Sequence, residues 1–124
     1  MSQVLAIALG GALGSVLRFW MSSGIYTLLG RSFPYGTLAV NILGCLLIGI
    51  LFVLFMERLT VDTVWRAGIL IGVLGGFTTF SSFSIETFNL IEGGAHLKAV
   101  LNMASSVFLC VGATWLGVIL ARQL

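Results

Sequence analysis

Charged side chains are scarce in this sequence. Only 8% of its 124 residues are Asp, Glu, Lys or Arg, whereas about 25% is typical of a soluble domain. Hydrophobic residues make up 59% of the chain, and the mean hydropathy is +1.15. A soluble protein of this size could not cover so much apolar surface with so few charges. We therefore expect lipid, rather than water, to surround most of the chain.

The residue types that catalysis and metal binding use are also few. The single histidine, His96, lies in a connector between apolar segments, and no nucleophile–base pair is predicted around it. Cys45 and Cys110 fall in separate apolar segments and lack the clustering of a zinc site, so we expect them to be small packing residues. We expect no enzyme activity. The net charge of +2 is too small to indicate a nucleic-acid partner.

Four long apolar segments predict an all-α membrane protein with four transmembrane helices. Each segment has about 20 residues or more, enough for a helix to cross a hydrocarbon core of about 30 Å. The connectors are short and leave no room for a soluble domain, so residues 1–124 should form one four-span transmembrane domain. The predicted segments run from about Val4 to Leu29, Tyr35 to Met56, Val64 to Ile91 and Leu97 to Ala121.

The third segment contains residues that an ordinary spanning helix would not have. Its motif reads Gly75-Gly76-Phe77-Thr78-Thr79-Phe80-Ser81-Ser82-Phe83-Ser84. Two adjacent glycines weaken a helix, and hydroxyl side chains then alternate with phenylalanines. Non-helical backbone at membrane depth is tolerated only where protein buries it or where it lines a wet cavity. We therefore expect the third helix to break near Gly75–Ser84, beside an ion pathway or a binding site.

The same motif has a period of three. As one helix it would carry Phe77, Phe80 and Phe83 as an aromatic ridge, and a hydroxyl ridge of Thr78, Ser81 and Ser84 would lie beside it. Such a ridge usually serves packing. Aromatic ring edges are electropositive, however, and could contact a small anion without a full positive charge. Hydroxyl donors beside them could replace part of the hydration shell of that anion.

Polar side chains in the other segments could complete such a pathway. Asn41 lies in the second segment, one helical turn after Thr37. Its amide can donate to an anion, although an interhelical hydrogen bond is an equally good interpretation. In the fourth segment, hydrogen bonds to the helix's own backbone are the alternative for the serines. The candidates there, with one more from the third segment, are Asn102, Ser105, Ser106 and Thr79.

Two charged residues lie within the apolar segments. Glu86 follows the hydroxyl ridge, and a carboxylate within a span is a functional candidate by default. Its oxygens could instead hold neighbouring hydroxyl groups in place. Arg18, in the first segment, could snorkel toward the interface, bind carbonyls at the broken helix, or form an anion-attracting vestibule.

Glycines recur at intervals of four in the first and third segments. Small residues at this spacing allow helix backbones to approach closely in lipid. The third segment should therefore pack tightly against a neighbouring helix or against a second copy of itself. The residues concerned are Gly10 and Gly14 in the first segment, and Gly68, Gly72 and Gly76 in the third.

The basic residues give almost no preference for one orientation in the membrane. With four spans, the two termini and the middle connector share one side, which carries Arg58, Arg66 and Arg122, while the other side carries Arg31 and Lys98. The side with more Lys and Arg residues usually faces the cytoplasm. Here one side has three such residues and the other has two, so the chain could insert in both orientations and pair with its own inverted copy. A topology fixed by other features is the alternative. Four packed helices leave a filled core, so a pore would need a second subunit.

At these residues the chain resembles the Fluc (CrcB) family of fluoride channels. The resemblance covers essentially the whole chain and is carried by the opening from Gly10 to Arg18, by Gly36-Thr37-Leu38-Ala39-Val40-Asn41, and by the motif from Gly75 to Ser84. It implies an antiparallel, dual-topology homodimer with two pores in the cytoplasmic (inner) membrane. It also implies passive export of fluoride, which enters the cell as hydrogen fluoride and dissociates inside.

The resemblance also implies roles for individual residues. Asn41, Phe80 and Phe83 would face the pore, with Ser106 as the fourth-span position and Glu86 near the path. The backbone carbonyls of Gly75 and Thr78 would hold a structural Na⁺ at the dimer centre.

Two other functions compete with a fluoride channel. Small multidrug-resistance-type transporters are also short, four-span and dual-topology, but they bind cations through an acidic residue in the first span, where this chain has Arg18 and no Asp or Glu. A non-transporting membrane assembly subunit would explain the glycine spacing but not the hydroxyl–phenylalanine motif.

Overall fold

The computed structural model describes all 124 residues, and every regular element in it is helical. Four helices are long and apolar enough to cross a membrane: Ser2–Leu29, Tyr35–Arg58, Thr63–Glu92 and His96–Arg122. This confirms the four predicted spans. The first span is α1 (Ser2–Leu29), and the second consists of α2 (Tyr35–Val53) and η1 (Leu54–Arg58). The third span is divided into α3 (Thr63–Arg66), η2 (Ala67–Val73), α4 (Leu74–Phe77) and α5 (Phe80–Glu92). The fourth span is α6 (His96–Gln123).

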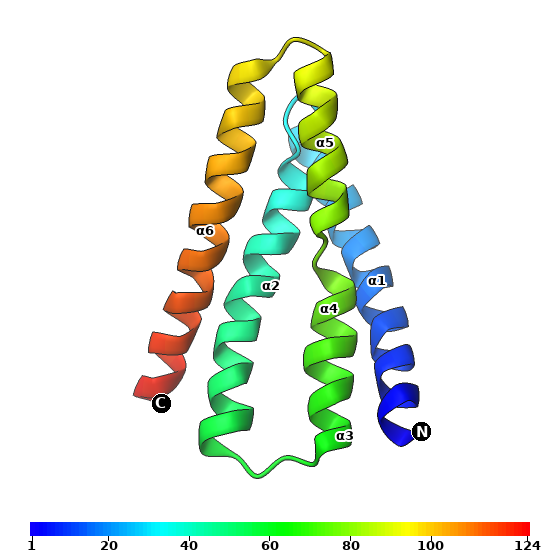
Figure 1. Cartoon of the computed structure of the whole chain (residues 1–124), viewed down its shortest axis with the longest axis vertical. Helices are drawn as coiled ribbons and strands as arrows, with labels where there is room; N and C mark the ends of the chain where they lie inside the picture. The colour runs from blue at the N-terminus through cyan, green and yellow to red at the C-terminus, as the bar shows by residue number, and fades with distance from the viewer.

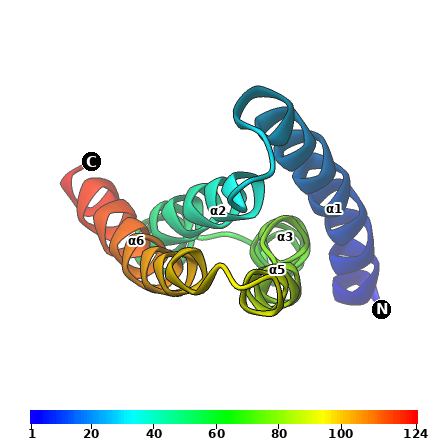
Figure 2. The ribbon, with the colours of Figure 1, turned by 90° about the horizontal axis from the view of Figure 1, so that it is seen from above.

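The spans form an open arrangement rather than a closed bundle. Both termini lie at the same end as the connector between η1 and α3, as four spans require (Figure 1). The second and fourth spans run in the same direction. Seen from above, α1 and α6 lie on opposite flanks, with α2 and the third span between them (Figure 2).

The third span breaks at two residues inside the predicted range. Thr78 and Thr79 have extended backbones, with φ/ψ of −86°/156° and −151°/120°. The Thr79 hydroxyl then caps α5 by accepting a hydrogen bond from the backbone N–H of Ser82 at 3.2 Å. The break lies after the two glycines, because Gly75 and Gly76 still belong to α4.

The break corrects one sequence-based expectation. Phe77 does not share a ridge with Phe80 and Phe83, because the extended residues turn α5 away from the register of α4. Phe77 is buried, whereas Phe80 is 79% exposed. Phe77 is therefore a packing residue, and Phe80 and Phe83 belong to a different surface of the molecule.

Glycines bring the first and third spans together, as their spacing predicts. A methyl group on Gly10 would overlap the carbonyl of Gly68, and one on Gly76 would lie 2.7 Å from the carbonyl of Gly11. The neighbour of the third span is thus α1 of the same chain. This close packing fixes α4, and with it the start of the break.

The second and fourth spans form the other close pair. A methyl group on Gly49 would overlap the carbonyl of Thr114, and one on Gly117 would overlap that of Leu46. The hydroxyl of Thr114 also donates to the carbonyl of Cys45 at 3.0 Å. These contacts hold α2 and α6 at a fixed separation and register.

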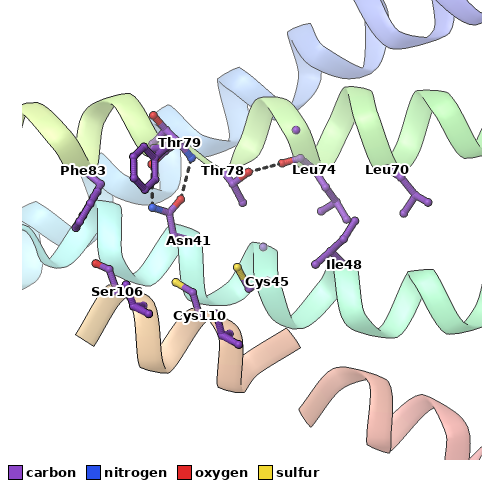
Figure 3. Close-up of a pocket in the computed structure, with 15 residues that line it drawn as sticks. Asn41, Cys45, Ile48, Leu70, Leu74, Thr78, Thr79, Phe83, Ser106 and Cys110 are labelled. Atoms are coloured by element: carbon purple, nitrogen blue, oxygen red, sulfur yellow. Dashed lines mark hydrogen bonds between the residues drawn. The ribbon is translucent and has the colours of Figure 1, made fainter. Parts of the chain in front are cut away.

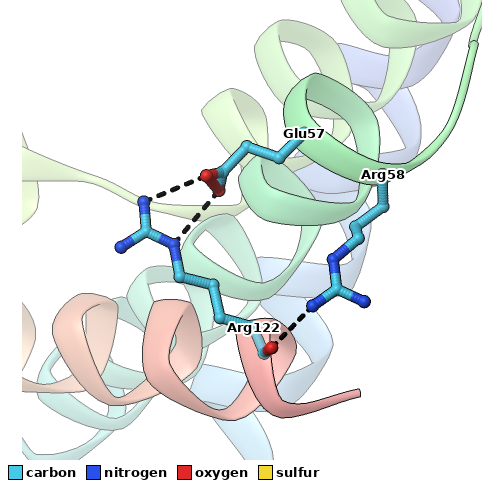
Figure 4. Close-up of polar contacts among 3 residues, drawn as sticks. All are labelled: Glu57, Arg58 and Arg122. Carbon is cyan, nitrogen blue, oxygen red and sulfur yellow. Dashed lines mark hydrogen bonds and ion pairs between the residues drawn. The ribbon is translucent and has the colours of Figure 1, made fainter.

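Polar contacts tie the span ends at both sides of the membrane region. At the terminal side, the Arg122 guanidinium makes two hydrogen bonds to Glu57, at 3.1 and 3.2 Å, and Arg58 donates to the Arg122 carbonyl at 2.6 Å (Figure 4). At the opposite side, Lys98 donates to the Ser32 carbonyl at 3.1 Å. The Glu57–Arg122 pair is exposed, so it contributes little to stability.

Most large apolar side chains point outward. Only 19 of the 124 residues are buried, and the exposed ones include Trp20, Phe108 and Trp115. Exposure of this apolar surface to water would be unfavourable, whereas lipid or a second subunit would cover it.

Candidate functional site

A groove of about 460 Å³ lies between α2, the broken third span and α6 (Figure 3). It combines a mostly apolar wall with a few polar groups near the helix break, which is the usual composition of a ligand site. No Asp, Glu, Lys, Arg or His side chain lines it. The predicted site residues that line this groove are Asn41, Gly75, Thr78, Thr79, Phe80, Phe83 and Ser106.

Asn41 holds the break in place. Its Nδ2 donates to the carbonyl of Thr79 at 2.9 Å, and its Oδ1 accepts from the backbone N–H of Thr79 at 2.8 Å (Figure 3). The side-chain oxygen thus replaces the helical acceptor that the Thr79 N–H lacks. Both interpretations of Asn41 remain compatible with this geometry, because Nδ2 carries a second hydrogen that can still donate into the groove.

The same hydrogen bonds leave a carbonyl free. In a continuous α-helix the N–H of Thr79 would donate to the carbonyl of Gly75, four residues earlier, but it donates to Asn41 instead. Space beside Gly75 is open, because a methyl group on this residue would meet no atom within 4 Å apart from its chain neighbours and its own helix backbone. The Thr78 hydroxyl donates to the Leu74 carbonyl at 3.0 Å.

Main-chain oxygens are the ligands that this chain could provide for a hard cation. No group of three or more His, Cys, Asp or Glu side chains comes together anywhere in it. Na⁺ prefers oxygen ligands, and carbonyls released at a helix break can supply them. The residues around Gly75 and Thr78 therefore fit a small hard cation in donor type, and one chain supplies too few ligands to enclose it.

Phe80 and Phe83 form a tilted pair at the groove. Their ring centroids are 5.2 Å apart and the ring planes are inclined by 48°. This is a favourable arrangement for two aromatic quadrupoles. Because Phe80 is largely exposed, it contributes little to the core of the single chain, and its ring is available to a ligand or to a second subunit.

Among the fourth-span candidates, only Ser106 lines the groove. The Ser105 hydroxyl donates to the carbonyl of Leu101 in its own helix. Asn102 is buried and donates to the hydroxyl of Thr87 at 2.8 Å, which joins α6 to α5. Of the three fourth-span candidates, Ser106 is therefore the one that can contact an ion in the groove.

Thr37 and Glu86 form a separate cluster, closer to the connector between α1 and α2. The Thr37 hydroxyl donates to Glu86 Oε1 at 2.7 Å, and the Tyr26 hydroxyl donates to Glu86 Oε2 at 3.4 Å. The guanidinium carbon of Arg31 lies 4.5 Å from the centre of the Tyr26 ring. Glu86 therefore holds neighbouring hydroxyl groups, as one of the two sequence interpretations states. The sequence does not predict Tyr26 here, because spacing gives no sign that residues 26 and 86 meet.

The remaining candidates lie outside the groove of the single chain. Ser81 and Ser84 are exposed on α5, and the Ser81 hydroxyl lies 3.3 Å from that of Thr79. Arg18 is partly exposed on α1, across the molecule from α6 (Figure 2). Sequence analysis also missed two groove residues, Cys45 and Cys110, because it treated each as an isolated packing residue.

The comparisons with known proteins all indicate one family. Residues 5–118 match the family model described as CrcB-like protein, Camphor Resistance (CrcB). A protein of Coxiella burnetii named "Fluoride-specific ion channel FluC" is 56% identical over 98% of this chain and 99% of its own length. Proteins of the same name from Geobacter sulfurreducens and Methylococcus capsulatus are 49% and 51% identical. The Geobacter match covers both chains fully, whereas this chain spans 54% of the Methylococcus protein. The chain therefore belongs to the CrcB family, a class of membrane channel rather than of enzyme.

Proposed function

We propose that this chain forms a fluoride-selective passive channel and that fluoride moves along the groove past Asn41, Phe80, Phe83 and Ser106. The observation that carries the proposal is the meeting of these four residues, from three spans, beside a helix break at membrane depth. The names of the relatives support fluoride as the ion. Fluoride would leave the cytoplasm across the inner membrane, down its own gradient.

The chemistry of the groove suits a strongly hydrated small anion. Fluoride must exchange part of its hydration shell for protein groups, without binding so tightly that it stays. The free N–H of Asn41, the Ser106 hydroxyl and the phenylalanine ring edges are weak donors that can act in series. Since no Lys or Arg lines the groove, no fixed charge would trap the ion.

Groups beyond the groove would extend this path in our proposal. Ser81 and Ser84 are exposed on α5, and Glu86, farther along the same helix, accepts a hydrogen bond from Thr37 of α2. Hydroxyl groups at these positions could carry the ion toward the connector side. Arg18 could raise the local anion concentration at a vestibule, since a basic residue attracts anions over a distance set by screening.

We further propose that the working unit is an antiparallel homodimer with two pores. The groove is open along one side in the single chain, so a second subunit can supply the missing wall. The basic residues are nearly balanced between the two sides, which permits both orientations. An inverted pair would contain two equivalent grooves, and each could serve as one pore.

A structural Na⁺ at the centre of this dimer is part of the same proposal. The Gly75 and Thr78 carbonyls would be its ligands, two from each subunit, and the open space at Gly75 supports this. The ion would join the inverted subunits and add positive potential near both anion paths. It would not be transported, so fluoride flux that carries Na⁺ in a fixed ratio would refute this role.

The groove argues against a transporter of organic cations. Small multidrug-resistance-type transporters bind organic cations through an acidic residue in the first span, whereas neither α1 nor the groove contains Asp or Glu. An assembly subunit without transport activity would leave the spare Asn41 donor in the groove without a role.

Ion efflux from proteoliposomes tests the function directly. Vesicles loaded with fluoride or with chloride and containing the purified protein are diluted into ion-free buffer, with valinomycin and K⁺ to balance charge. We expect fast fluoride release and chloride release at the rate of protein-free vesicles. Equal release of both ions would contradict fluoride selectivity, and no fluoride release from a folded protein would contradict the channel.

A further inference from the structure

The two cysteines of the chain come together in the groove, although they are 65 residues apart in sequence. Both line its wall, and both are partly exposed. Figure 3 shows both side chains in the groove, at the seam between α2 and α6. No other cysteine is present in the chain, so this is its only thiol pair.

The position of this pair follows from the parallel course of the two helices. Cys45 lies four residues after Asn41 in α2, and Cys110 lies four residues after Ser106 in α6. Because α2 and α6 run in the same direction (Figure 1), the thiol pair follows the Asn41–Ser106 pair by about one helical turn of 5.4 Å. The groove thus carries polar residues of both helices about one turn apart, first Asn41 and Ser106 and then Cys45 and Cys110.

The separation of the two thiols is held by the close packing just beyond them. Gly49 and Gly117 let the backbones of α2 and α6 touch, and Thr114 donates to the Cys45 carbonyl. The two helices therefore cannot move apart at this level without breaking these contacts. Two thiols in one groove, on helices whose packing is fixed, are preorganised to bind one ion between them.

We propose that Cys45 and Cys110 form a binding site for a soft, thiophilic metal ion, of which Hg²⁺, Ag⁺ and Cu⁺ are representatives. Thiolates select soft metals, whereas zinc would need about four ligands, and no third Cys, His, Asp or Glu joins this pair. A linear two-coordinate ion needs only the two sulfurs. For Hg²⁺, two S–H bonds break, two S–Hg bonds form, and two protons leave to solvent, with no change of oxidation state.

Occupation of the site would also narrow the groove. A bridged metal fills the space one turn from Asn41 and Ser106, so it should slow fluoride movement. This second consequence rests on the proposed function, whereas the binding itself does not. The two parts can therefore be tested separately.

Binding is tested with Hg²⁺ alone on the purified full-length protein. Intact-mass measurement should find one mercury per chain with the loss of two protons, and both thiols should become unreactive toward a maleimide. Cys45→Ser and Cys110→Ser should each bind about 10²-fold more weakly or worse, because the second ligand is no longer intramolecular. Two mercury ions per chain, or one shared between two chains, would overturn the bridged site.

A positional control separates bridging from simple thiol reactivity. In Ser105→Cys/Cys110→Ser the number of thiols is unchanged, but the new one lies where Ser105 bonds to its own helix. This variant should bind mercury at each thiol independently. Bridging in this variant, as in the wild type, would show that the geometry of the Cys45–Cys110 pair is not what matters.

Fluoride efflux then tests the effect on the path. Hg²⁺ should slow efflux through the wild-type protein, excess dithiothreitol should restore it, and Cys45→Ser/Cys110→Ser should be insensitive. Bridging without any effect on efflux would overturn the placement of the site beside the path. Absence of efflux before mercury is added would contradict the proposed channel and leave the mass and thiol measurements to decide the metal site.

Discussion

The side-chain amide of Asn41 exchanges two hydrogen bonds with the main chain of Thr79, at 2.8 and 2.9 Å. A single residue of α2 thereby stabilises the interruption of the third span. The two extended residues, which would otherwise expose unpaired backbone groups at membrane depth, acquire a partner from a neighbouring helix. The polar residue that supports the break is also the one that can offer a donor to the groove.

The aromatic pair gives the first prediction. Phe80→Ile and Phe83→Ile keep apolar bulk but remove the electropositive ring edge. Each should reduce fluoride efflux at least about tenfold, which needs a loss of only about 1.4 kcal/mol in the barrier. Stability should change little for Phe80, whose side chain is largely exposed.

Phe19→Ile is the matched control for these two variants. Phe19 is 66% exposed and lies on α1, on the flank away from α6 (Figure 2). Efflux through Phe19→Ile should equal that of the wild type. If all three variants behave alike, the Phe80–Phe83 pair has no special part in conduction.

Neighbouring serines of α6 give the second prediction. Ser106→Ala removes a hydroxyl that lines the groove, whereas Ser105→Ala removes one that donates within its own helix. We expect slower fluoride efflux for Ser106→Ala only, measured with a fluoride electrode on vesicles of equal protein content. A larger loss in Ser105→Ala would mean that the wrong face of α6 has been assigned to the path.

The carboxylate cluster gives the third prediction. Thr37→Val removes the 2.7 Å hydrogen bond to Glu86, and bonds to charged groups contribute about 1.5–3 kcal/mol. Tyr26→Phe removes only longer contacts, at 3.4 Å to Glu86 and at 3.4 and 3.5 Å to Thr37, and should cost less. Thermal unfolding of purified variants should rank them in this order.

A double-mutant cycle isolates the contact of Thr37 with Glu86. The variant Thr37→Val/Glu86→Ala should lose less stability than the sum of the single variants, with a coupling of about 0.5–3 kcal/mol. Strict additivity would mean that the hydroxyl and the carboxylate do not act together.

The balance of basic residues gives the fourth prediction. After Cys45 and Cys110 are replaced by Ser, a single cysteine placed in residues 31–33, 59–61 or 93–95 should react with a membrane-impermeant maleimide from both sides. Added lysines in residues 59–61 should bias insertion and abolish activity unless an oppositely biased copy is co-expressed. Labelling of each connector from one side only would exclude dual topology.

Much of the fold could be predicted because the membrane leaves the chain few options. Apolar length alone sets the four spans, and the glycine spacing correctly indicates the close packing of the third span. The break is also predictable, since Gly75, Gly76 and the hydroxyl residues disfavour a continuous helix. Its location at Thr78 and Thr79, after the glycines, depends on Asn41, and that contact joins residues 38 positions apart.

The candidate site was less predictable than the fold, because its residues come together only through contacts that are distant in sequence. Ser105 and Ser106 are chemically identical, and only the orientation of α6 decides which of them lines the groove. Glu86 could not be assigned its partners without knowing that α1, α2 and α5 meet near Tyr26 and Thr37. Cys45 and Cys110 gave no signal, because their proximity depends on the parallel register of α2 and α6.

Fluoride efflux through Asn41→Asp tests the proposed path most directly. The variant keeps the size of the side chain and the acceptor for the Thr79 N–H, loses the donor to the Thr79 carbonyl, and places a negative charge at the groove. Two like charges about 4 Å apart repel by about 4 kcal/mol at an effective dielectric constant of about 20, or roughly 10³-fold in occupancy. In a dimer confirmed to be folded, we predict fluoride efflux at the background rate of protein-free vesicles. Efflux near the wild-type rate would contradict the assignment of this groove as the fluoride path.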